Sequence, residues 1–304
     1  MDKQVGILDI GTNTTLLLTA RWDAGQQAWT DIQTQQRFTR IGERLKDQGQ
    51  IPAFVMERNL ECLREYKTHC QAHGITQLYA FGTSALRDAS NGADFARLAK
   101  MQLNIDVQII SGQREAELIC KSVADLYQNS QQPLYILDIG GGSTELIQWQ
   151  DQQIKFLKSL NLGVVHLTAE FFNPDPPSPT QIEQCRKYLA NLFQKNYPPF
   201  APGKLVAIGG TATSAFGLIE KLTVYEPEKV EGKTLQLSAL ENLFSQLSQL
   251  SPADRIHEPQ LPAKRADVFL AGLLILMEEL KVLNVRETLV SDRGLRYGVL
   301  EELL

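Results

Sequence analysis

Two short segments of the sequence combine an aspartate with glycines and small polar residues, a pattern suited to binding phosphate. Residues 5–18 read V-G-I-L-D-I-G-T-N-T-T-L-L-L, and residues 134–147 read L-Y-I-L-D-I-G-G-G-S-T-E-L-I. In each segment an apolar strand ends on an aspartate, Asp9 or Asp138, and a turn follows. Glycines let the backbone turn tightly and approach a ligand closely, and clustered backbone N–H groups bind anions. The sequence therefore predicts two strand–turn–strand phosphate sites.

The two aspartates are 138 − 9 = 129 residues apart, which is the size of one domain. This spacing indicates an internal duplication at the scale of a domain. A third glycine turn, Gly209-Gly210-Thr211, follows another apolar strand within residues 205–214. None of the three turns matches G-x-x-x-x-G-K-[ST] or G-x-G-x-x-G, so neither a Walker loop nor a dinucleotide fingerprint is predicted.

Several charged residues lie near further strand ends. Arg87 follows a predicted strand at 78–82, and Glu115 lies in a helix that begins after the strand at 107–110, with Ser111 as its expected N-cap. A basic run also follows the first hairpin. It could be a solvated face or a track for a long phosphate chain, and it consists of Arg37, Arg40, Arg44 and Lys46.

The elements that must position these residues alternate between strand and helix. Apolar residues recur at helical spacing over 53–72, and a hairpin over 134–160 turns near Gln150-Asp151. In the second half we expect a strand at 289–290, a closing helix over 295–304, and helices over 163–172, 180–195, 211–222, 238–248 and 263–282. This alternation predicts an α/β protein.

Composition narrows the class of protein. A chain of 304 residues, with 43% hydrophobic and 21% charged residues, corresponds to roughly two globular domains and excludes wholesale disorder. The net charge of −5 argues against nucleic acid as a partner, so a polyanionic substrate needs a local basic patch.

Cellular location is also constrained by the sequence. The longest apolar stretch, 269–277, is far shorter than the about 20 residues that cross a membrane, and residues 1–4 show no leader pattern. The four cysteines are scattered and suit free thiols in a reducing compartment. We therefore expect a cytoplasmic protein without a membrane partner.

Five further motifs narrow the assignment to one family. They are T-S-A-L-R at 83–87, I-S-G-Q-R-E-A at 110–116, D-I-G-G-G-S-T-E at 138–145, R-A-D-V at 265–268 and S-D-R-G-L-R at 291–296. With the three turns, they make residues 5–304 resemble the exopolyphosphatase/guanosine pentaphosphate phosphohydrolase family in its short two-domain form. That family lies within the superfamily of sugar kinases, actin and heat-shock chaperones.

The resemblance implies an α/β fold of two actin-like (ribonuclease H-like) domains with a cleft between them. Residues 1–123 plus 296–304 would form domain I, and residues 124–295 would form domain II. It also implies a homodimer.

The resemblance further implies a role for each candidate residue. Glu115 would be the catalytic base, with Arg87 on the terminal phosphate. Asp138, Glu145 and Asp9 would hold Mg²⁺ or Mn²⁺, ions that prefer oxygen ligands, and Glu145 would also take part in catalysis by positioning water. The groups that would bind phosphate are those of Thr12, Asn13, Thr14, Gly141, Gly142, Ser143 and Thr144.

Each of these roles has a structural alternative. Asp9 and Asp138 could merely cap turns, Glu115 could be a first-turn acid favoured by the helix dipole, and Arg87 could form a surface ion pair. Gly209-Gly210 could equally serve turn geometry alone. The pairing of matching hairpins and the motif around Glu115 favour the functional interpretation.

Two positions depart from the family pattern. Arg114 stands where the family often has an acid, and Tyr297 stands where it often has a glutamate. Neither replaces an expected catalytic residue, but Arg114 adds a positive charge next to Glu115.

The sequence therefore predicts an exopolyphosphatase that removes the terminal phosphate of inorganic polyphosphate. The alternative within the same chemistry is guanosine pentaphosphate (pppGpp) 5′-phosphohydrolase. Further alternatives are an actin-like ATP-dependent kinase, which would use the Gly209-Gly210-Thr211 turn for adenosine, and a non-catalytic polyphosphate or alarmone sensor.

Overall fold

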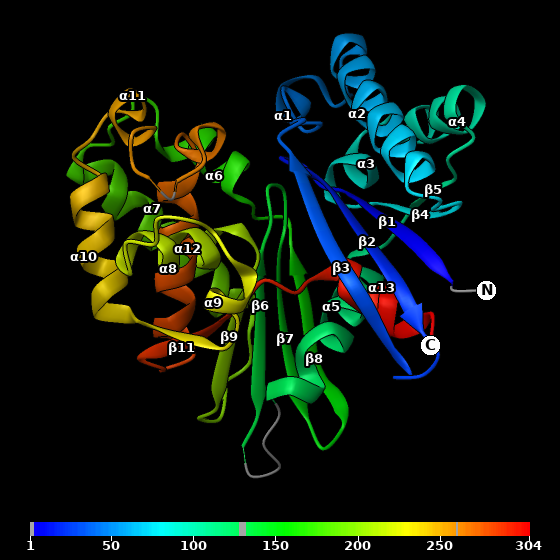
Figure 1. Cartoon of the computed structure of the whole chain (residues 1–304). Helices are drawn as coiled ribbons and strands as arrows, with labels where there is room; N and C mark the ends of the chain where they lie inside the picture. Colours follow the sequence, from blue (N-terminus) through cyan, green and yellow to red (C-terminus); the bar gives the residue numbers. More distant parts are fainter. Residues whose placement is uncertain (1–2, 128–131, 260) are drawn as a thin grey trace. The chain divides into compact units, whose positions relative to one another are not determined.

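The computed structural model describes residues 3–127, 132–259 and 261–304, and the chain forms two compact units (Figure 1). Unit 1 comprises Met1–Leu118 and Leu295–Leu304, and unit 2 comprises Ile119–Gly294. Helix α5 (Gly112–Tyr127) carries the chain from unit 1 into unit 2. The boundaries expected from the sequence, 123/124 and 295/296, lie a few residues beyond these divisions.

Unit 1 is built on a five-stranded sheet in which β1 pairs antiparallel with β2 and parallel with β4. In spatial order its strands are β3 (Ala28–Arg37), β2 (Thr15–Asp23), β1 (Gln4–Ile10), β4 (Gln77–Gly82) and β5 (Val107–Ile109). Its other helices are α1 (Leu45–Gln48), α2 (Ala53–Ala72), α3 (Ser84–Asp88), α4 (Gly92–Leu103) and α13 (Leu295–Glu302). The long helices α2 and α4 pack their apolar faces on the sheet and enclose the core of the unit.

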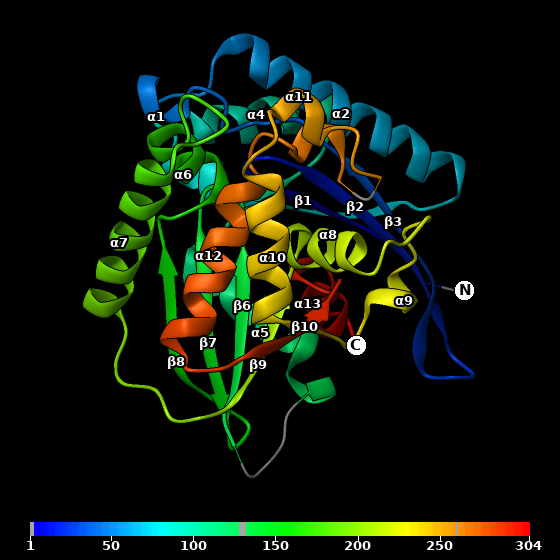
Figure 2. The ribbon, with the colours of Figure 1, turned by 90° about the vertical axis from the view of Figure 1, so that its left-hand side faces the viewer.

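Unit 2 is built on a six-stranded sheet. In spatial order its strands are β10 (Lys233–Gln236), β11 (Glu287–Ser291), β9 (Lys204–Ile208), β6 (Leu134–Ile139), β7 (Thr144–Gln150) and β8 (Gln153–Leu160). Its helices include α6 (Val164–Phe171), α7 (Pro179–Asn196), α8 (Gly210–Ile219), α9 (Pro227–Val230), α10 (Leu237–Leu247), α11 (Pro252–Arg255) and α12 (Phe269–Val282). Figure 2 shows α7, α12 and α10 side by side over one face of this sheet, where the apolar core lies.

The two sheets share one topology, which confirms the α/β prediction and shows the duplication directly. When β10 is set aside, β3-β2-β1-β4-β5 corresponds strand by strand to β8-β7-β6-β9-β11. The turns correspond as well: Gly11 N donates to Thr14 O at 2.9 Å, and Gly140 N donates to Ser143 O at 2.9 Å. The same local sequence therefore closes the same turn at the same place in each sheet.

The segment 263–282, expected to form one helix, is interrupted in the structure. Residues Ala263–Arg265 form a single 3-10 turn, and α12 begins only at Phe269. The carbonyl of Ala266, which falls in this break, accepts a hydrogen bond at 2.9 Å from Nη1 of Arg255. In a continuous helix the carbonyl of Ala266 would accept a backbone hydrogen bond, but here it accepts one from the side chain of Arg255.

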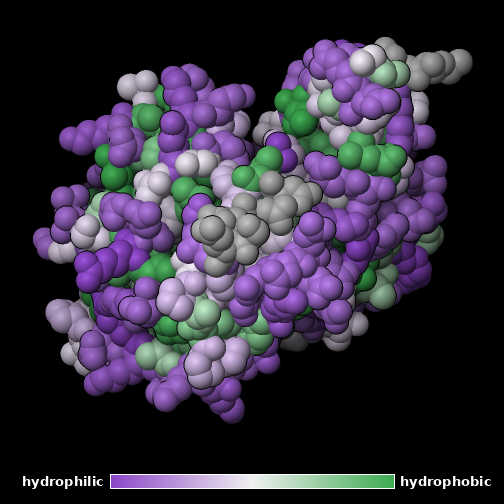
Figure 3. Space-filling model, turned by 90° about the horizontal axis from the view of Figure 1, so that it is seen from below, coloured by the Kyte–Doolittle hydropathy of each residue, from purple (hydrophilic) through white to green (hydrophobic). Residues whose placement is uncertain are grey.

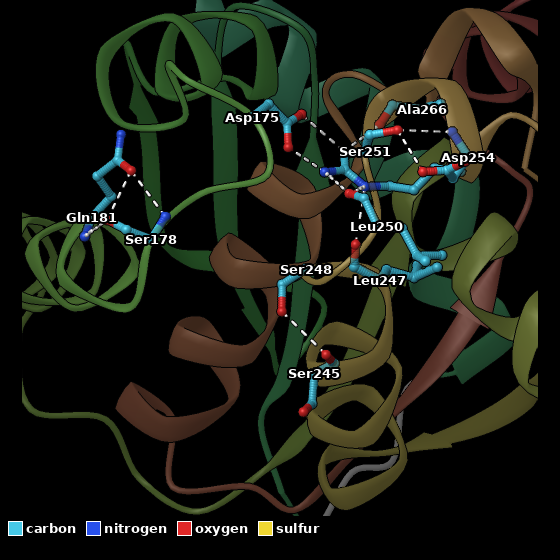
Figure 4. Close-up of polar contacts among 11 residues, drawn as sticks. Asp175, Ser178, Gln181, Ser245, Leu247, Ser248, Leu250, Ser251, Asp254 and Ala266 are labelled. Atoms are coloured by element: carbon cyan, nitrogen blue, oxygen red, sulfur yellow. Dashed lines mark hydrogen bonds and ion pairs between the residues drawn. The ribbon is translucent and has the colours of Figure 1, made fainter.

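Arg255 is fully buried and holds three segments of unit 2 together. Its guanidinium forms a bidentate ion pair with Asp175. It also donates hydrogen bonds to the carbonyls of Leu247, Leu250 and Ala266. Figure 4 shows these acceptors converging on one point. A buried guanidinium is tolerated only when its donors are satisfied, as they are here.

One face of the molecule shows few extended apolar areas (Figure 3). On the face shown in Figure 3, hydrophilic side chains predominate and hydrophobic ones form small separate patches. The four cysteines are buried free thiols, as predicted. Within the described parts of the chain, no helix has the length and hydropathy needed to cross a bilayer.

Replacing Arg255 with alanine tests whether this residue stabilises unit 2 by joining the three segments. We expect the free energy of unfolding to fall by about 3–5 kcal/mol, because Asp175 and several carbonyls lose their buried partner. Urea unfolding measures the change. Lys187→Ala, which removes an exposed pair with Glu183, is the control and should change stability by less than about 1 kcal/mol. A similarly small effect for Arg255→Ala would contradict this stabilising role.

Candidate active site

In unit 1 the ends of three parallel strands bring the predicted site residues to one edge of the sheet. Strands β1, β4 and β5 run parallel. Beyond the strand ends, Thr83 N donates to Ile10 O at 3.3 Å and Ile110 N donates to Gly82 O at 3.0 Å. The segments that follow these strands carry the first glycine turn, Arg87 and Glu115. Ligands of α/β proteins bind at such carboxyl-terminal edges.

The first glycine turn, residues 11–14, presents backbone donors without protein acceptors. Thr12 and Asn13 are buried, at 4% and 7% exposure. Among the described residues, no acceptor is found for the amides of Thr12, Asn13 or Thr14, and Oδ1 of Asn13 also has no hydrogen-bond partner there. Buried backbone donors are rarely left unpaired in proteins, so water or a ligand must supply the acceptors for this turn.

Arg87 and Glu115 contact one another. Ser111 Oγ accepts a hydrogen bond from Arg114 N at 3.1 Å and caps α5, as expected, which places Glu115 in the first turns of that helix. The Glu115 carboxylate is buried, with 8% of the residue exposed. Nη1 of Arg87 lies 3.2 Å from Oε2 of Glu115 and also donates to Ile110 O at 3.0 Å. The guanidinium therefore fixes the orientation of the carboxylate.

Asp9 lies near the end of β1, two residues before Gly11, and Arg296, which was not predicted as a site residue, lies close enough to affect its pKa. Burial raises the pKa of Asp9 to about 6, and the positive charge of Arg296 partly opposes this rise in the pKa. Arg296 is buried, and its Nη1 atom has no hydrogen-bond partner among the described residues. Only its place in the motif at 291–296 could have signalled this arginine.

Arg114, the first departure from the family pattern, forms ion pairs within unit 1. Its guanidinium is bonded to Glu302 of α13 and lies 3.7 Å from Glu117. Arg114 therefore links α5 to α13 through the carboxylate of Glu302.

In unit 2 two predicted carboxylates stand side by side on neighbouring strands. Asp138 of β6 lies directly opposite Glu145 of β7, and Glu145 lies opposite Ser159 of β8. Residues directly opposite in antiparallel strands share a face of the sheet. Ser159 Oγ donates to Oε1 of Glu145 at 2.6 Å, and Glu145 is only 1% exposed. Ser159 was not predicted, but its position in register with Glu145 is clear once the hairpin is known.

The second glycine turn, residues 140–143, is held from behind by helix α6. Val164 N and Val165 N donate to the carbonyls of Gly140 and Gly141 at 3.0 Å. Gly163 packs so closely that a Cβ there would lie 2.2 Å from Gly141 O. The turn carbonyls face the protein, whereas no acceptor is found among the described residues for the amides of Gly141, Gly142 or Ser143.

Thr144, also expected to bind phosphate, has a different contact. Its side chain is fully buried, and its hydroxyl donates to Leu162 O at 2.5 Å. The hydroxyl therefore anchors the segment between β8 and α6.

The third turn, at Gly209-Gly210, is covered by an arginine. Gly209 has a φ of +81°, which favours glycine. A Cβ on Gly210 would lie 1.7 Å from Nη1 of Arg265, so the guanidinium lies directly on the backbone of this turn. Burial lowers the pKa of Arg265 to about 10, and the nearby Tyr225 and Asp292 act in the opposite direction. The positively charged side chain of Arg265 therefore lies against the backbone of this turn.

A further unpredicted residue, Glu231, binds the end of β11 and the loop that follows it. Its carboxylate accepts hydrogen bonds from Ser291 Oγ at 2.8 Å and Asp292 N at 3.0 Å, and it also bonds the hydroxyl of Tyr127. No pattern in the sequence marked this glutamate.

The residues present suit a divalent ion that is shared with a phosphate ligand. Within the described residues, no three His, Cys, Asp or Glu side chains gather into a metal cluster. Asp138 and Glu145 nevertheless provide two adjacent carboxylates. Mg²⁺ is commonly bound by one or two carboxylates, with substrate phosphates and water completing its shell.

The raised pKa of Asp9 predicts a pH-dependent cost to stability. The carboxyl binds its proton more tightly in the folded protein, with a pKa of about 6, than at its ordinary value of 3.8. The wild-type protein should therefore lose stability relative to Asp9→Asn as pH rises from about 4 to about 6, with no further change above.

Urea unfolding at several pH values measures this difference. Asp106→Asn, which removes an exposed carboxylate, controls for the loss of a surface charge. A wild-type-minus-Asp9→Asn difference that stays constant across this window would contradict the assignment.

Comparison with known proteins identifies the family. The Ppx/GppA phosphatase family matches residues 19–304. Exopolyphosphatase 1 of Mycobacterium tuberculosis is 26% identical over 301 residues, covering 98% of this chain and 87% of that protein. The guanosine-5′-triphosphate,3′-diphosphate pyrophosphatase of Aeromonas salmonicida is 28% identical over 297 residues, covering 98% of this chain and 58% of that protein.

Solved structures agree with this match. The Aquifex aeolicus member of the Ppx/GppA family superposes with a TM-score of 0.83 at 28% identity, covering 100% of this chain and 98% of that one. An exopolyphosphatase from Cytophaga hutchinsonii gives a TM-score of 0.87 at 26% identity, covering 99% and 97%. The two-domain actin-like fold expected from the sequence is thus confirmed. The chain belongs to the Ppx/GppA phosphatase family.

Proposed function

We propose that this protein hydrolyses the terminal phosphoanhydride bond of inorganic polyphosphate. The observation that carries the proposal is the pair of matching turns, each offering three successive backbone amides for which the described residues provide no acceptor. Such donor sets bind phosphate oxygens, and preorganised donors stabilise the charge that develops during phosphoryl transfer. Membership of a phosphatase family supports the same reaction.

Glu115 is proposed as the base that takes a proton from the attacking water. Its carboxylate is buried and held in one orientation by Arg87, which supports the proposal. Arg87 retains further guanidinium donors, and we assign it to the terminal phosphate, where a planar fork suits an anion. The phosphate-binding groups of Thr12, Asn13, Thr14, Gly141, Gly142 and Ser143 would hold the chain in line with the water.

Asp138 and Glu145 are proposed as protein ligands of Mg²⁺ or Mn²⁺, with Asp9 as a further carboxylate. A bound divalent ion would neutralise charge on the phosphoryl oxygens. In unit 2, Ser159 donates to Oε1 of Glu145 and so holds that carboxylate in one orientation.

Hydrolysis of pppGpp is the second candidate, because a relative with that named activity matches 98% of this chain. The kinase alternative has less support, since Arg265 lies on the third turn, where adenosine would have to bind. A non-catalytic sensor would not need the fixed Arg87–Glu115 pair. The cytoplasmic location and the homodimer stay predictions.

A comparison of three substrates tests the proposal. Purified protein with Mg²⁺ should show a higher kcat/KM for polyphosphate than for pppGpp, and little release of phosphate from ATP, measured as inorganic phosphate over time. Reactions with chelator in place of metal should be slow. A higher kcat/KM for pppGpp would favour the second candidate, and ATP turnover without polyphosphate hydrolysis would favour a kinase.

Replacing Glu115 with glutamine tests its role as the base. We expect kcat to fall by about 10²–10⁴-fold, because the amide cannot accept the proton of water, while KM changes little. The matched control is Glu117→Gln. Glu117 lies two residues further along the same helix, its side chain is more exposed than that of Glu115, and its replacement should leave turnover unchanged. Equal kcat values for the two variants would remove Glu115 from this role.

A further inference from the structure

We propose that His69 and His73 of helix α2, together with Gln35 of strand β3, form a metal site in unit 1 for a divalent ion that favours nitrogen ligands, such as Ni²⁺, Zn²⁺ or Cu²⁺. This site is separate from the carboxylates Asp138 and Glu145 of unit 2, and it does not depend on the proposed function. It follows from the spacing of the two imidazole rings, from the hydrogen bonds that fix their protonation, and from their exposure to solvent.

The two imidazole rings lie next to each other on one face of α2. His69 and His73 are four residues apart, a spacing that brings side chains together on a helix. Their ring centroids lie 4.3 Å apart, and the ring planes are tilted by 37°. A metal ion bound at about 2.0–2.1 Å to one nitrogen of each ring would hold the centroids about 4.5–5 Å apart. The rings therefore need to separate only slightly to bind an ion together.

The hydrogen bonds of the two rings show which nitrogen of each ring carries a lone pair. Nε2 of His69 lies 2.9 Å from Nε2 of Gln35. An amide nitrogen only donates, so Nε2 of His69 is the acceptor and carries the lone pair. Nδ1 of His73 lies 2.8 Å from the carbonyl oxygen of His69. A carbonyl oxygen only accepts, so Nδ1 of His73 carries a proton, and the lone pair of the neutral ring is on Nε2.

Both histidines are therefore held in the form that binds metal ions. Neutral imidazole binds a metal through its unprotonated nitrogen, and a histidine ligand usually donates its other N–H to a backbone carbonyl or a similar acceptor. His73 already makes such a bond to the carbonyl of His69. An ion at Nε2 of His69 would replace a single hydrogen bond from Gln35, whose amide oxygen can then turn toward the ion as a third ligand.

An ion can reach the pair from solvent. His73 is exposed and His69 is half-buried. Cys70 lies between them in the sequence, but its side chain is fully buried and packs near Gly6, where a Cβ would lie 3.2 Å from its Sγ. Within the described ranges no third His, Cys, Asp or Glu joins the pair. Water would therefore complete the ligand shell of an ion bound by the two rings and the amide.

Binding of Ni²⁺ to the protein without a histidine tag tests the site. Ni²⁺ suits imidazole ligands whereas Mg²⁺ suits carboxylates, so isothermal titration calorimetry is carried out with Mg²⁺ in excess to fill sites made of oxygen ligands. His69→Gln and His73→Gln each remove one ring of the pair. The matched control is His257→Gln in unit 2, which removes an exposed histidine outside the pair. Thermal unfolding without Ni²⁺ checks that each variant keeps the fold.

We expect the parent protein and His257→Gln to bind one Ni²⁺ with the same Kd. Each variant of the pair should raise this Kd by about tenfold or more, because losing even a group that supports a metal ligand costs about 10–100-fold in affinity. Ni²⁺ should raise the Tm of the parent and of the control, but not that of the pair variants. Ni²⁺ binding as tight in His69→Gln and His73→Gln as in the control overturns the site, as does a parent protein that binds no Ni²⁺.

Discussion

The same backbone hydrogen bond closes a turn in each unit, and the candidate site depends on these two turns. In each unit a glycine amide donates to a carbonyl three residues later, Gly11 to Thr14 and Gly140 to Ser143, and this bond closes a turn at the end of a buried strand. Closing the turn directs three following amides away from any acceptor among the described residues. Because unpaired backbone donors are costly when buried, such a turn persists only where other contacts stabilise it or a ligand supplies the missing acceptors.

Different contacts support the two turns. The first turn is supported by the loop that contains Gly42, whose amide occupies Thr12 O, and the second by the start of α6, whose amides occupy Gly140 O and Gly141 O. The carboxylates also differ. Leu16 pairs with Asp9 in unit 1, where Glu145 pairs with Asp138 in unit 2. Both halves therefore contain a turn with three amides that lack an acceptor among the described residues, whereas the paired carboxylates are found in one half alone among those residues.

Much of this arrangement could be predicted from the sequence because the responsible signals are local. The two D-I-G turns, the strands before them and the cap at Ser111 each depend on a few adjacent residues. Strand β3 was not predicted, since it is an exposed edge strand whose polar residues, such as Thr34 and Gln36, give no apolar alternation. Helix 263–282 was extended too far because apolar periodicity does not reveal that Arg255, eight residues upstream, would bind a carbonyl within it.

The residues that sequence reasoning missed act through contacts between distant segments. Ser159 reaches Glu145 only because β7 and β8 pair in one register, and Arg296 affects Asp9 although 287 residues separate them. Arg265 was known as part of a motif, but its position on Gly210 follows from how the third turn packs. Spacing along the chain predicts which residue types matter, whereas such long-range contacts require the folded structure.

The proposed function requires each turn to contribute to the same reaction, and single and double variants of the turns test this requirement most directly. Asn13→Ala in unit 1 and Ser143→Ala in unit 2 are measured singly and together for kcat/KM on polyphosphate. If both turns contribute to the same reaction, each single variant lowers kcat/KM by about tenfold, the cost of a lost hydrogen bond to a charged group, and the double variant loses more than either single variant. A single variant that keeps the kcat/KM of the parent protein would show that its turn takes no part in the reaction and would contradict the account.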